Sequence, residues 1–140
     1  MERTASAEWL GTLREGKGTM TAPSGVLREA PYTFGTRFED TPGTNPEELI
    51  GAAHAGCFSM ALSGKLVAAG MTPERIRTTA RVTLEKTDAG MTVTRIHLDV
   101  KARAGNATPQ KFRAAAEDAM ATCPISRLLK AEFTLSAALE

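Results

Sequence analysis

The stretch from Asn45 to Gly70, NPEELIGAAHAGCFSMALSGKLVAAG, decides the fold of this 140-residue chain. It opens with an asparagine N-cap, a proline at the first helical position and two acidic residues, and it closes on a glycine. Residues 49–64 carry no formal charge and place small or apolar side chains on every face. A helix without a polar face is typical of a buried position. The stretch therefore predicts a long, buried central helix, too short and too interrupted by His54 and glycine to span a membrane.

The residues before this helix favour β-structure. Residues 4–13 and 17–22 alternate loosely between apolar and polar side chains, and Gly16 and Pro23-Ser24-Gly25 separate or end these runs. Residues 32–38 hold the only tyrosine and two of the five phenylalanines, and a breaker cluster follows them. We expect three strands of a meander in this region.

The residues after the helix predict a β-hairpin. Residues 76–84 and 91–102 alternate, and the turn Asp88-Ala89-Gly90 lies between them. The apolar phase slips between Val93 and Ile96, which predicts a β-bulge near Thr94.

The end of the chain predicts two helices and a strand. Thr108-Pro109 opens a helix that continues to Met120, Pro124 restarts a short helical turn, and residues 133–139 alternate. Grouped strands, a buried helix, a hairpin, further helices and a last strand favour an α+β fold over a regular parallel β-α-β series. No repeat or long linker divides the sequence, so we expect one domain over residues 1–140.

Composition excludes several classes of protein. The chain has seventeen Lys and Arg and sixteen Asp and Glu, which gives a net charge of +1, and no block of like charge occurs. Binding to nucleic acid through bulk charge is therefore not expected. The first ten residues carry Glu2, Arg3 and Glu8 and no apolar segment, so we expect a cytoplasmic protein without a membrane partner.

Cys57 and Cys123 are the only cysteines. Both can be buried, inert side chains, as free cysteines often are. They can also form a redox pair, because Cys123 precedes a helical turn whose free N–H groups favour a thiolate. A metal site with His54 and His97 lacks close-spaced ligand pairs, and a Cys57–His54 hydrolase lacks a third orienting group. Neither of these two alternatives is favoured.

Two charged residues near the helix N-terminus are further candidates. Arg37 lies between Thr36 and Phe38 in a segment that otherwise resembles core, although most such arginines are surface cations with a packed stem. Glu47 has a sufficient structural explanation as a first-turn acid that complements the helix dipole.

Three segments together resemble a known family. They are YTFGTRFED (32–40), GTNPEELIGAAHAGCFSMAL (43–62) and CPISRLLKAE (123–132). In this order and spacing the chain resembles the OsmC/Ohr family of thiol-dependent hydroperoxide peroxidases, and is more similar to the OsmC branch. The likeness covers essentially the whole length.

The resemblance implies an intertwined α+β homodimer, with antiparallel sheets packed around the long central helix. It implies that Cys57 is the peroxidatic thiolate and Cys123 the resolving thiol, with Arg37 as the activating arginine and Glu47 as the glutamate that holds it. It also implies hydroperoxide substrates, organic ones preferred, and a dithiol reductant carried by lipoylated proteins. No metal or other cofactor is expected.

Geometry adds an expectation about the dimer. Glu47 and Cys57 are ten residues apart, or about 15 Å along one helix, so they cannot share a site within that helix. Two copies of the helix crossing antiparallel near Ala52 would bring Glu47 of one subunit close to Cys57 of the other. The alternative functions are a cysteine-based redox sensor or small-molecule binding protein on the same fold, and an interaction module with inert cysteines.

Overall fold

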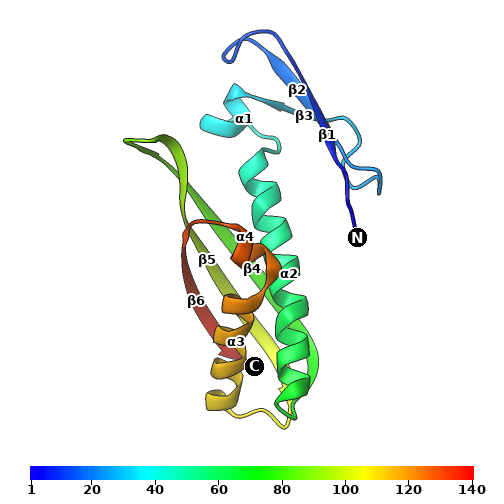
Figure 1. Cartoon of the computed structure of the whole chain (residues 1–140), viewed down its shortest axis with the longest axis vertical. Coiled ribbons are helices and arrows are strands. Elements are labelled where there is room, and N and C mark those ends of the chain that lie inside the picture. Colours follow the sequence, from blue (N-terminus) through cyan, green and yellow to red (C-terminus); the bar gives the residue numbers. More distant parts are fainter. The chain divides into compact units, whose positions relative to one another are not determined.

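The computed structural model describes all 140 residues. Their contacts divide the chain into two units, residues 1–49 and residues 50–140, and each unit is described by itself. Figure 1 labels the helices and strands of both. None of the helices is both long and apolar enough to cross a membrane.

The first unit is a three-stranded antiparallel sheet followed by one turn of helix. Its strands β1 (Ser6–Leu10), β2 (Lys17–Thr21) and β3 (Ala30–Thr33) pair in the order β1-β2-β3. Gly18 is required in β2, because a Cβ atom there would lie 2.6 Å from Tyr32 and 2.7 Å from Trp9. Because Gly18 has no Cβ atom, the rings of Tyr32 and Trp9 can approach to 5.3 Å between centroids.

The expected third strand ends earlier than the sequence suggested. Residues 34–38 form the short helix α1 (Phe34–Phe38), so the prediction of a strand over residues 32–38 is wrong for its second half. The cause is a capping box: the Thr33 hydroxyl accepts from the Thr36 backbone N–H, and the Thr36 hydroxyl accepts from that of Thr33. These local bonds outweigh the β propensity of the aromatic residues.

The long helix α2 (Pro46–Ala68) begins and ends as predicted. The Asn45 side chain accepts from the Glu48 backbone N–H at 2.9 Å, which caps the N-terminus. At the other end Gly70 has a φ of +78°, and Met71 donates its N–H to the Leu66 carbonyl. Only one face of α2 is buried, so the expectation of burial all round is wrong for the single chain. The buried residues are Glu47, Gly51, His54, Phe58, Leu62 and Leu66.

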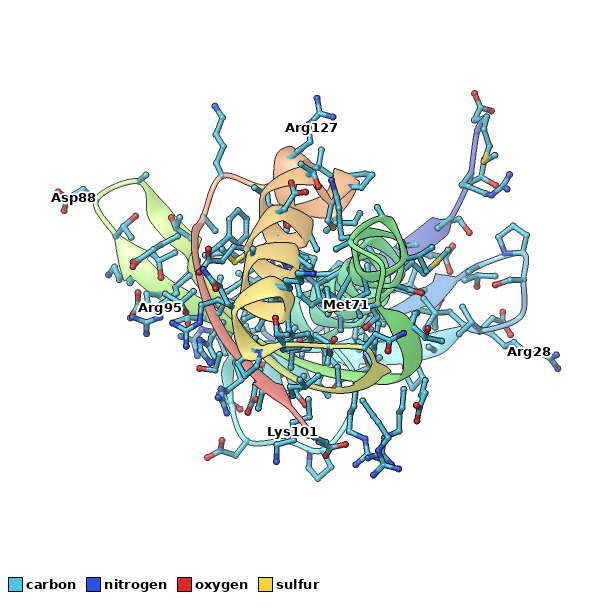
Figure 2. All side chains as sticks on the ribbon, turned by 90° about the horizontal axis from the view of Figure 1, so that it is seen from below. Arg28, Met71, Asp88, Arg95, Lys101 and Arg127 are labelled. Atoms are coloured by element: carbon cyan, nitrogen blue, oxygen red, sulfur yellow. The ribbon has the colours of Figure 1, made fainter.

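The second unit contains a sheet with the order β4-β5-β6. The strands β4 (Thr72–Thr87) and β5 (Gly90–Gly105) form the predicted antiparallel hairpin. Asp88 lies at its tip, as Figure 2 shows. Thr83 pairs with Arg95 and Leu84 pairs with Val93, which leaves Thr94 as the extra residue of the predicted bulge.

The last strand joins this sheet in a direction that the sequence did not reveal. The predicted helices are present as α3 (Pro109–Thr122) and α4 (Pro124–Leu128), and they lead to β6 (Glu132–Leu139). β6 pairs with β5 in parallel, because α3 and α4 form a crossover connection. The expectation of antiparallel sheets therefore holds for the first sheet and for β4–β5 only.

The core of the second unit lies where α2 and α3 cover one face of this sheet (Figure 1). Four alternate residues of β5 face it, and these, three residues of α2 and three of α3 are no more than 2% exposed. They are Phe58, Leu62, Leu66, Ile96, Leu98, Val100, Ala102, Phe112, Ala116 and Ala119. All buried hydrophobic residues of the chain lie between Phe58 and Cys123, so the first unit has no buried apolar core of its own.

Candidate active site

The second unit brings the two cysteines together. Cys57 lies in the middle of α2, and Cys123 lies between α3 and α4, 66 positions later. Cys123 ends α3 because its φ and ψ of −56° and 130° leave the helical region, and Pro124 then starts α4. The Sγ atoms of the two residues are 2.7 Å apart. Both thiols are free, Cys57 half-buried and Cys123 fully buried.

The surroundings of the two thiols act on their pKa values in opposite directions. Burial raises the pKa of Cys57, and the hydrogen bond with Cys123 raises it further, against the backbone N–H of Ile125. Burial also opposes ionisation of Cys123. Hydrogen bonds from Cys57 and from the backbone N–H and hydroxyl of Ser126 outweigh it, so the pKa of Cys123 lies below its ordinary value. Within the second unit, the negative charge of the pair is therefore favoured on Cys123.

A buried histidine and a serine lie beside the thiol pair. His54 is 0% exposed, one turn before Cys57, and its Nε2 atom is 2.8 Å from Ser126 Oγ. Burial lowers the pKa of His54, which keeps its ring neutral. The prediction of a packed core histidine is confirmed, with the ring edge-on to Phe133. Sequence reasoning missed Ser126, although its place three residues after Cys123 in CPIS was a usable signal.

The first unit brings Arg37 and Glu47 together. The Arg37 Nη2 atom donates to Glu47 Oε1 at 2.8 Å, and its Nε atom donates to both carboxylate oxygens at 3.2 Å. The hydrogen bond to Glu47 raises the pKa of Arg37, against partial burial. The Glu47 side chain is 12% exposed and that of Arg37 36%. The guanidinium is held firmly by one carboxylate, and part of it is free for another ligand.

Local structure fixes the direction of this arginine. The single turn of α1 starts at the Thr33–Thr36 capping box, and the Asn45 amide donates to the Thr36 carbonyl at 3.0 Å. These bonds tie the turn that carries Arg37 to the start of the helix that carries Glu47. Asn45 was predicted as an N-cap, but its second bond was not foreseen.

Arg37 borders a pocket within the first unit. The pocket has a volume of about 410 Å³, and four aromatic side chains line it. Its lining includes Trp9, Leu13, Tyr32, Phe34, Phe38 and Arg37. It combines an apolar wall with a single cationic group, an arrangement suited to an apolar molecule with one polar end.

The structure thus assembles the four predicted residues as two pairs, Cys57 with Cys123 and Arg37 with Glu47. No group of three His, Cys, Asp or Glu side chains gathers as a metal site would require. His97, considered above as a ligand, instead lies with Nδ1 2.6 Å from the Thr134 hydroxyl on β6.

An α+β chain that brings two distant free thiols into contact belongs to a class of candidate thiol redox proteins. Comparison with known proteins identifies the family. A family model described as OsmC-like protein matches residues 38–137. Proteins named Peroxiredoxin OsmC from Escherichia coli K12 and Shigella flexneri are 50% identical over 135 residues, 96% of this chain and 94% of theirs. The chain belongs to the OsmC-like family, and the resemblance inferred from its sequence is confirmed.

Solved structures share the fold. An OsmC-like protein from Mycoplasma pneumoniae superposes with a TM-score of 0.74 at 12% identity, covering 99% of this chain and 97% of that one. The organic hydroperoxide resistance protein OhrB of Bacillus subtilis gives a TM-score of 0.70 at 22% identity, covering 96% and 98%. These similarities confirm the α+β fold class.

Proposed function

We propose that this protein is a thiol-dependent peroxidase that reduces hydroperoxides. The observation that carries the proposal is the approach of Cys57 and Cys123 to 2.7 Å across 66 positions of sequence. Two thiols this close can form a disulfide after a small movement. Names of the relatives support the same activity, since they describe peroxiredoxins and organic hydroperoxide resistance proteins.

In the proposed reaction, Cys57 is the thiol that meets the peroxide. It is the more exposed of the two thiols, whereas Cys123 is fully buried. The Cys57 thiolate attacks the distal oxygen of ROOH, a sulfur–oxygen bond forms, the oxygen–oxygen bond breaks, and the leaving alkoxide takes a proton to become an alcohol. Cys123 then attacks the Cys57 sulfenic acid, a disulfide forms, and hydroxide leaves and takes a proton to become water.

The first step requires a cation near Cys57. Burial and Cys123 raise the pKa of the Cys57 thiol, and the one cation of α4, Arg127, extends outward in Figure 2. We assign this role to Arg37, held by Glu47, because a guanidinium stabilises both a thiolate and the charge that develops on the leaving oxygen. The aromatic pocket beside Arg37 favours organic hydroperoxides over hydrogen peroxide.

We further propose that the working form is an intertwined homodimer with composite sites. The first unit lacks a buried apolar core, and α2 leaves one apolar face exposed. Residues of that face include Ala52, Ala53, Gly56, Met60, Gly64 and Val67. A second copy that covers these surfaces would remove both from water, and Glu47 of one α2 would approach Cys57 of the other if the helices cross antiparallel.

A dithiol, in our proposal a lipoyl group on a partner protein, returns two electrons and two protons to the disulfide. A peroxidase that depends on such thiols belongs in a reducing compartment, and we assign the protein to the cytoplasm. No metal or other cofactor takes part in the proposed steps.

The decisive experiment measures turnover of tert-butyl hydroperoxide with a lipoyl recycling system. We expect sustained peroxide consumption by the wild-type chain, none by Cys57→Ser, and a single oxidation event by Cys123→Ser. A redox sensor would stop after one equivalent. Equal single-event oxidation in the two variants would contradict the assigned roles.

Intact mass after one equivalent of peroxide gives an independent check. A loss of two hydrogens indicates a disulfide. An unchanged mass would support a module with inert cysteines and would overturn the proposal.

A further inference from the structure

His54 is a buried polar side chain for which the proposed reaction has no use so far. Its ring is 0% exposed, and its Nδ1 atom has no hydrogen-bond partner. A buried polar group that lacks a partner is destabilising, so a purely structural position would favour an apolar side chain. Its other nitrogen, Nε2, is directed to Ser126 Oγ at 2.8 Å. The ring therefore has a single hydrogen-bond partner, which is Ser126.

Ser126 connects this histidine to the resolving thiol. It is 6% exposed and lies in the first turn of α4, three residues after Cys123, where its backbone N–H and hydroxyl favour the Cys123 thiolate and lower the pKa of that thiol. A serine hydroxyl has one hydrogen to donate and can accept from another group at the same time. When its hydrogen points to the Cys123 sulfur, its oxygen must accept from His54, which assigns the neutral ring the tautomer with hydrogen on Nε2. The orphan atom is then the unprotonated Nδ1.

We propose that His54 and Ser126 form a buried hydrogen-bond chain that holds Cys123 ready to attack oxidised Cys57. In this proposal Ser126 donates its hydroxyl hydrogen to the reacting sulfur, and His54 is a positioning residue that orients the serine hydroxyl. This inference rests on the proposed function, because it concerns the second step of that reaction. It gives the two thiols separate supports: Arg37 for the first attack, and the His54–Ser126 chain for the second.

The His54–Ser126 hydrogen-bond chain assists the step in which the disulfide forms. The Cys123 thiolate attacks the Cys57 sulfur, the sulfur–sulfur bond forms and the sulfur–oxygen bond of the sulfenic acid breaks. Hydroxide leaves and is protonated to water, and the charge on Cys123 disappears. The Ser126 hydrogen bond is strongest to the thiolate and weak to a disulfide sulfur, so it stabilises the attacking form.

Other titratable groups do not compete for this role. Cys57 on α2 faces Cys123 directly, and His54 reaches it through Ser126. Phe133 on β6 covers the ring of His54 with an apolar edge. Arg127 on α4 is exposed and points away (Figure 2).

The first test titrates the Cys123 thiol in a Cys57→Ser background and needs no peroxide. We expect Ser126→Ala to lower the thiolate fraction at neutral pH about tenfold, the effect of losing one hydrogen bond to a charged group. His54→Asn and His54→Gln form a matched pair, because a Gln amide can reach the position of Nε2 and an Asn amide that of Nδ1. His54→Gln should retain the titration of the background chain, and His54→Asn should shift it in the same direction as Ser126→Ala.

The second test separates the two oxidation steps in chains that keep both cysteines. Trapping with dimedone reports the Cys57 sulfenic acid, and intact mass reports the disulfide. We expect Ser126→Ala and His54→Asn to slow disulfide formation about tenfold without slowing sulfenic acid formation. Melting temperatures identify any variant that fails to fold, and Ser126→Thr, which retains the hydroxyl, then replaces Ser126→Ala as the informative variant, with wild-type rates expected.

Two results would overturn the inference. Unchanged titration and unchanged disulfide formation in Ser126→Ala and His54→Asn would overturn the inference. Equal slowing by His54→Gln and His54→Asn would also overturn it, because the effect would then come from packing. A wild-type chain that forms neither sulfenic acid nor disulfide would refute the proposed function, whereas the titration would still test the His54–Ser126 hydrogen-bond chain.

Discussion

At the scale of single residues, the four candidate side chains form two pairs whose surroundings differ in charge. Arg37 binds Glu47 through three hydrogen-bond contacts, whereas Cys57 and Cys123 share one short contact. The sulfur that reaches the peroxide first in our proposal is the one whose pKa the second unit raises. In our proposal, activity therefore depends on a positive charge supplied from outside the second unit.

Replacing Arg37 by alanine tests that dependence. We expect Arg37→Ala to slow oxidation of Cys57 at least about tenfold, because a guanidinium near a thiol lowers its pKa by one or more units. The free energy of unfolding should change by less than about 1 kcal/mol, since the Arg37–Glu47 pair is partly exposed. Stopped-flow oxidation and a thiol titration measure the effect.

Arg28→Ala is the matched control for this experiment. Arg28 is exposed, and Figure 2 shows it extending away from the strands, with a bond from its Nε atom to the Gly25 carbonyl only. It should oxidise like the wild type. If the thiol titration of Arg37→Ala equals that of the wild type, Arg37 is not part of the site.

His54 predicts a pH dependence of stability. Burial lowers its pKa in the folded chain, so the unfolded chain binds a proton more readily. The folded state should therefore lose stability as the pH falls below about 6.5, the ordinary histidine value, by up to about 1.4 kcal/mol per pH unit until the folded pKa is reached. Above that window the term vanishes. Urea unfolding of wild-type and His54→Gln chains between pH 5 and 8 measures the difference, and parallel curves would contradict it.

At the scale of elements, α2 shows why an apolar composition did not predict which of its faces are buried. Its sequence is apolar on every side, yet one chain covers only one of those sides. Leu62 is 0% exposed in the core, whereas Met60, two residues earlier, is 80% exposed. The uncovered side carries no formal charge over residues 49–64, and an exposed uncharged surface with apolar side chains typically marks an interface.

A pair of substitutions on α2 distinguishes the two faces. Leu62→Ala should lower the free energy of unfolding by about 2–5 kcal/mol at every protein concentration, because it opens a cavity in the core. Met60→Ala should change the stability of the dilute chain by no more than about 0.5 kcal/mol. If a second copy covers Met60, its effect should grow with protein concentration. A concentration-independent effect of Met60→Ala would contradict the proposed interface.

Helix capping and the crossover before β6 explain which of the other elements could be predicted from the sequence. The sequence signals at Asn45, Thr108 and Gly70 placed helix ends correctly, because each works through bonds within a few residues. The helical turn of residues 34–38 was missed because aromatic residues favour strands and the Thr33–Thr36 capping box was not recognised. The direction of β6 was not foreseen, since alternation is the same in parallel and antiparallel strands.

At the scale of the whole molecule, the proposal requires a second copy of the chain. A Cβ atom at Gly56 would meet nothing within 4 Å in the single chain, so a larger residue fits there without strain. In a dimer whose helices approach closely, Gly56→Leu should shift the assembly toward monomer and reduce peroxide turnover in proportion. Ala114→Leu, at an exposed position on α3, is the control and should leave both unchanged.

Sedimentation velocity and turnover over a dilution series provide the readout. A monomeric chain that retains full activity at high dilution would rule out composite sites. An activity that falls with the dimer fraction would support them, and mixing Cys57→Ser with Arg37→Ala chains should restore part of the activity.

The sequence by itself determined the order of the elements apart from α1, the ends of the long helix, the bulge at Thr94 and the four candidate residues, because these depend on local bonds, on periodicity or on motifs that lie within single segments. Tertiary structure alone decided which face of α2 is covered, that β6 runs parallel to β5, and that His54 Nε2 lies within hydrogen-bond distance of Ser126 Oγ. Those features arise from packing between segments far apart in the chain, where burial and direction depend on the partner surface and leave no periodic trace in the sequence.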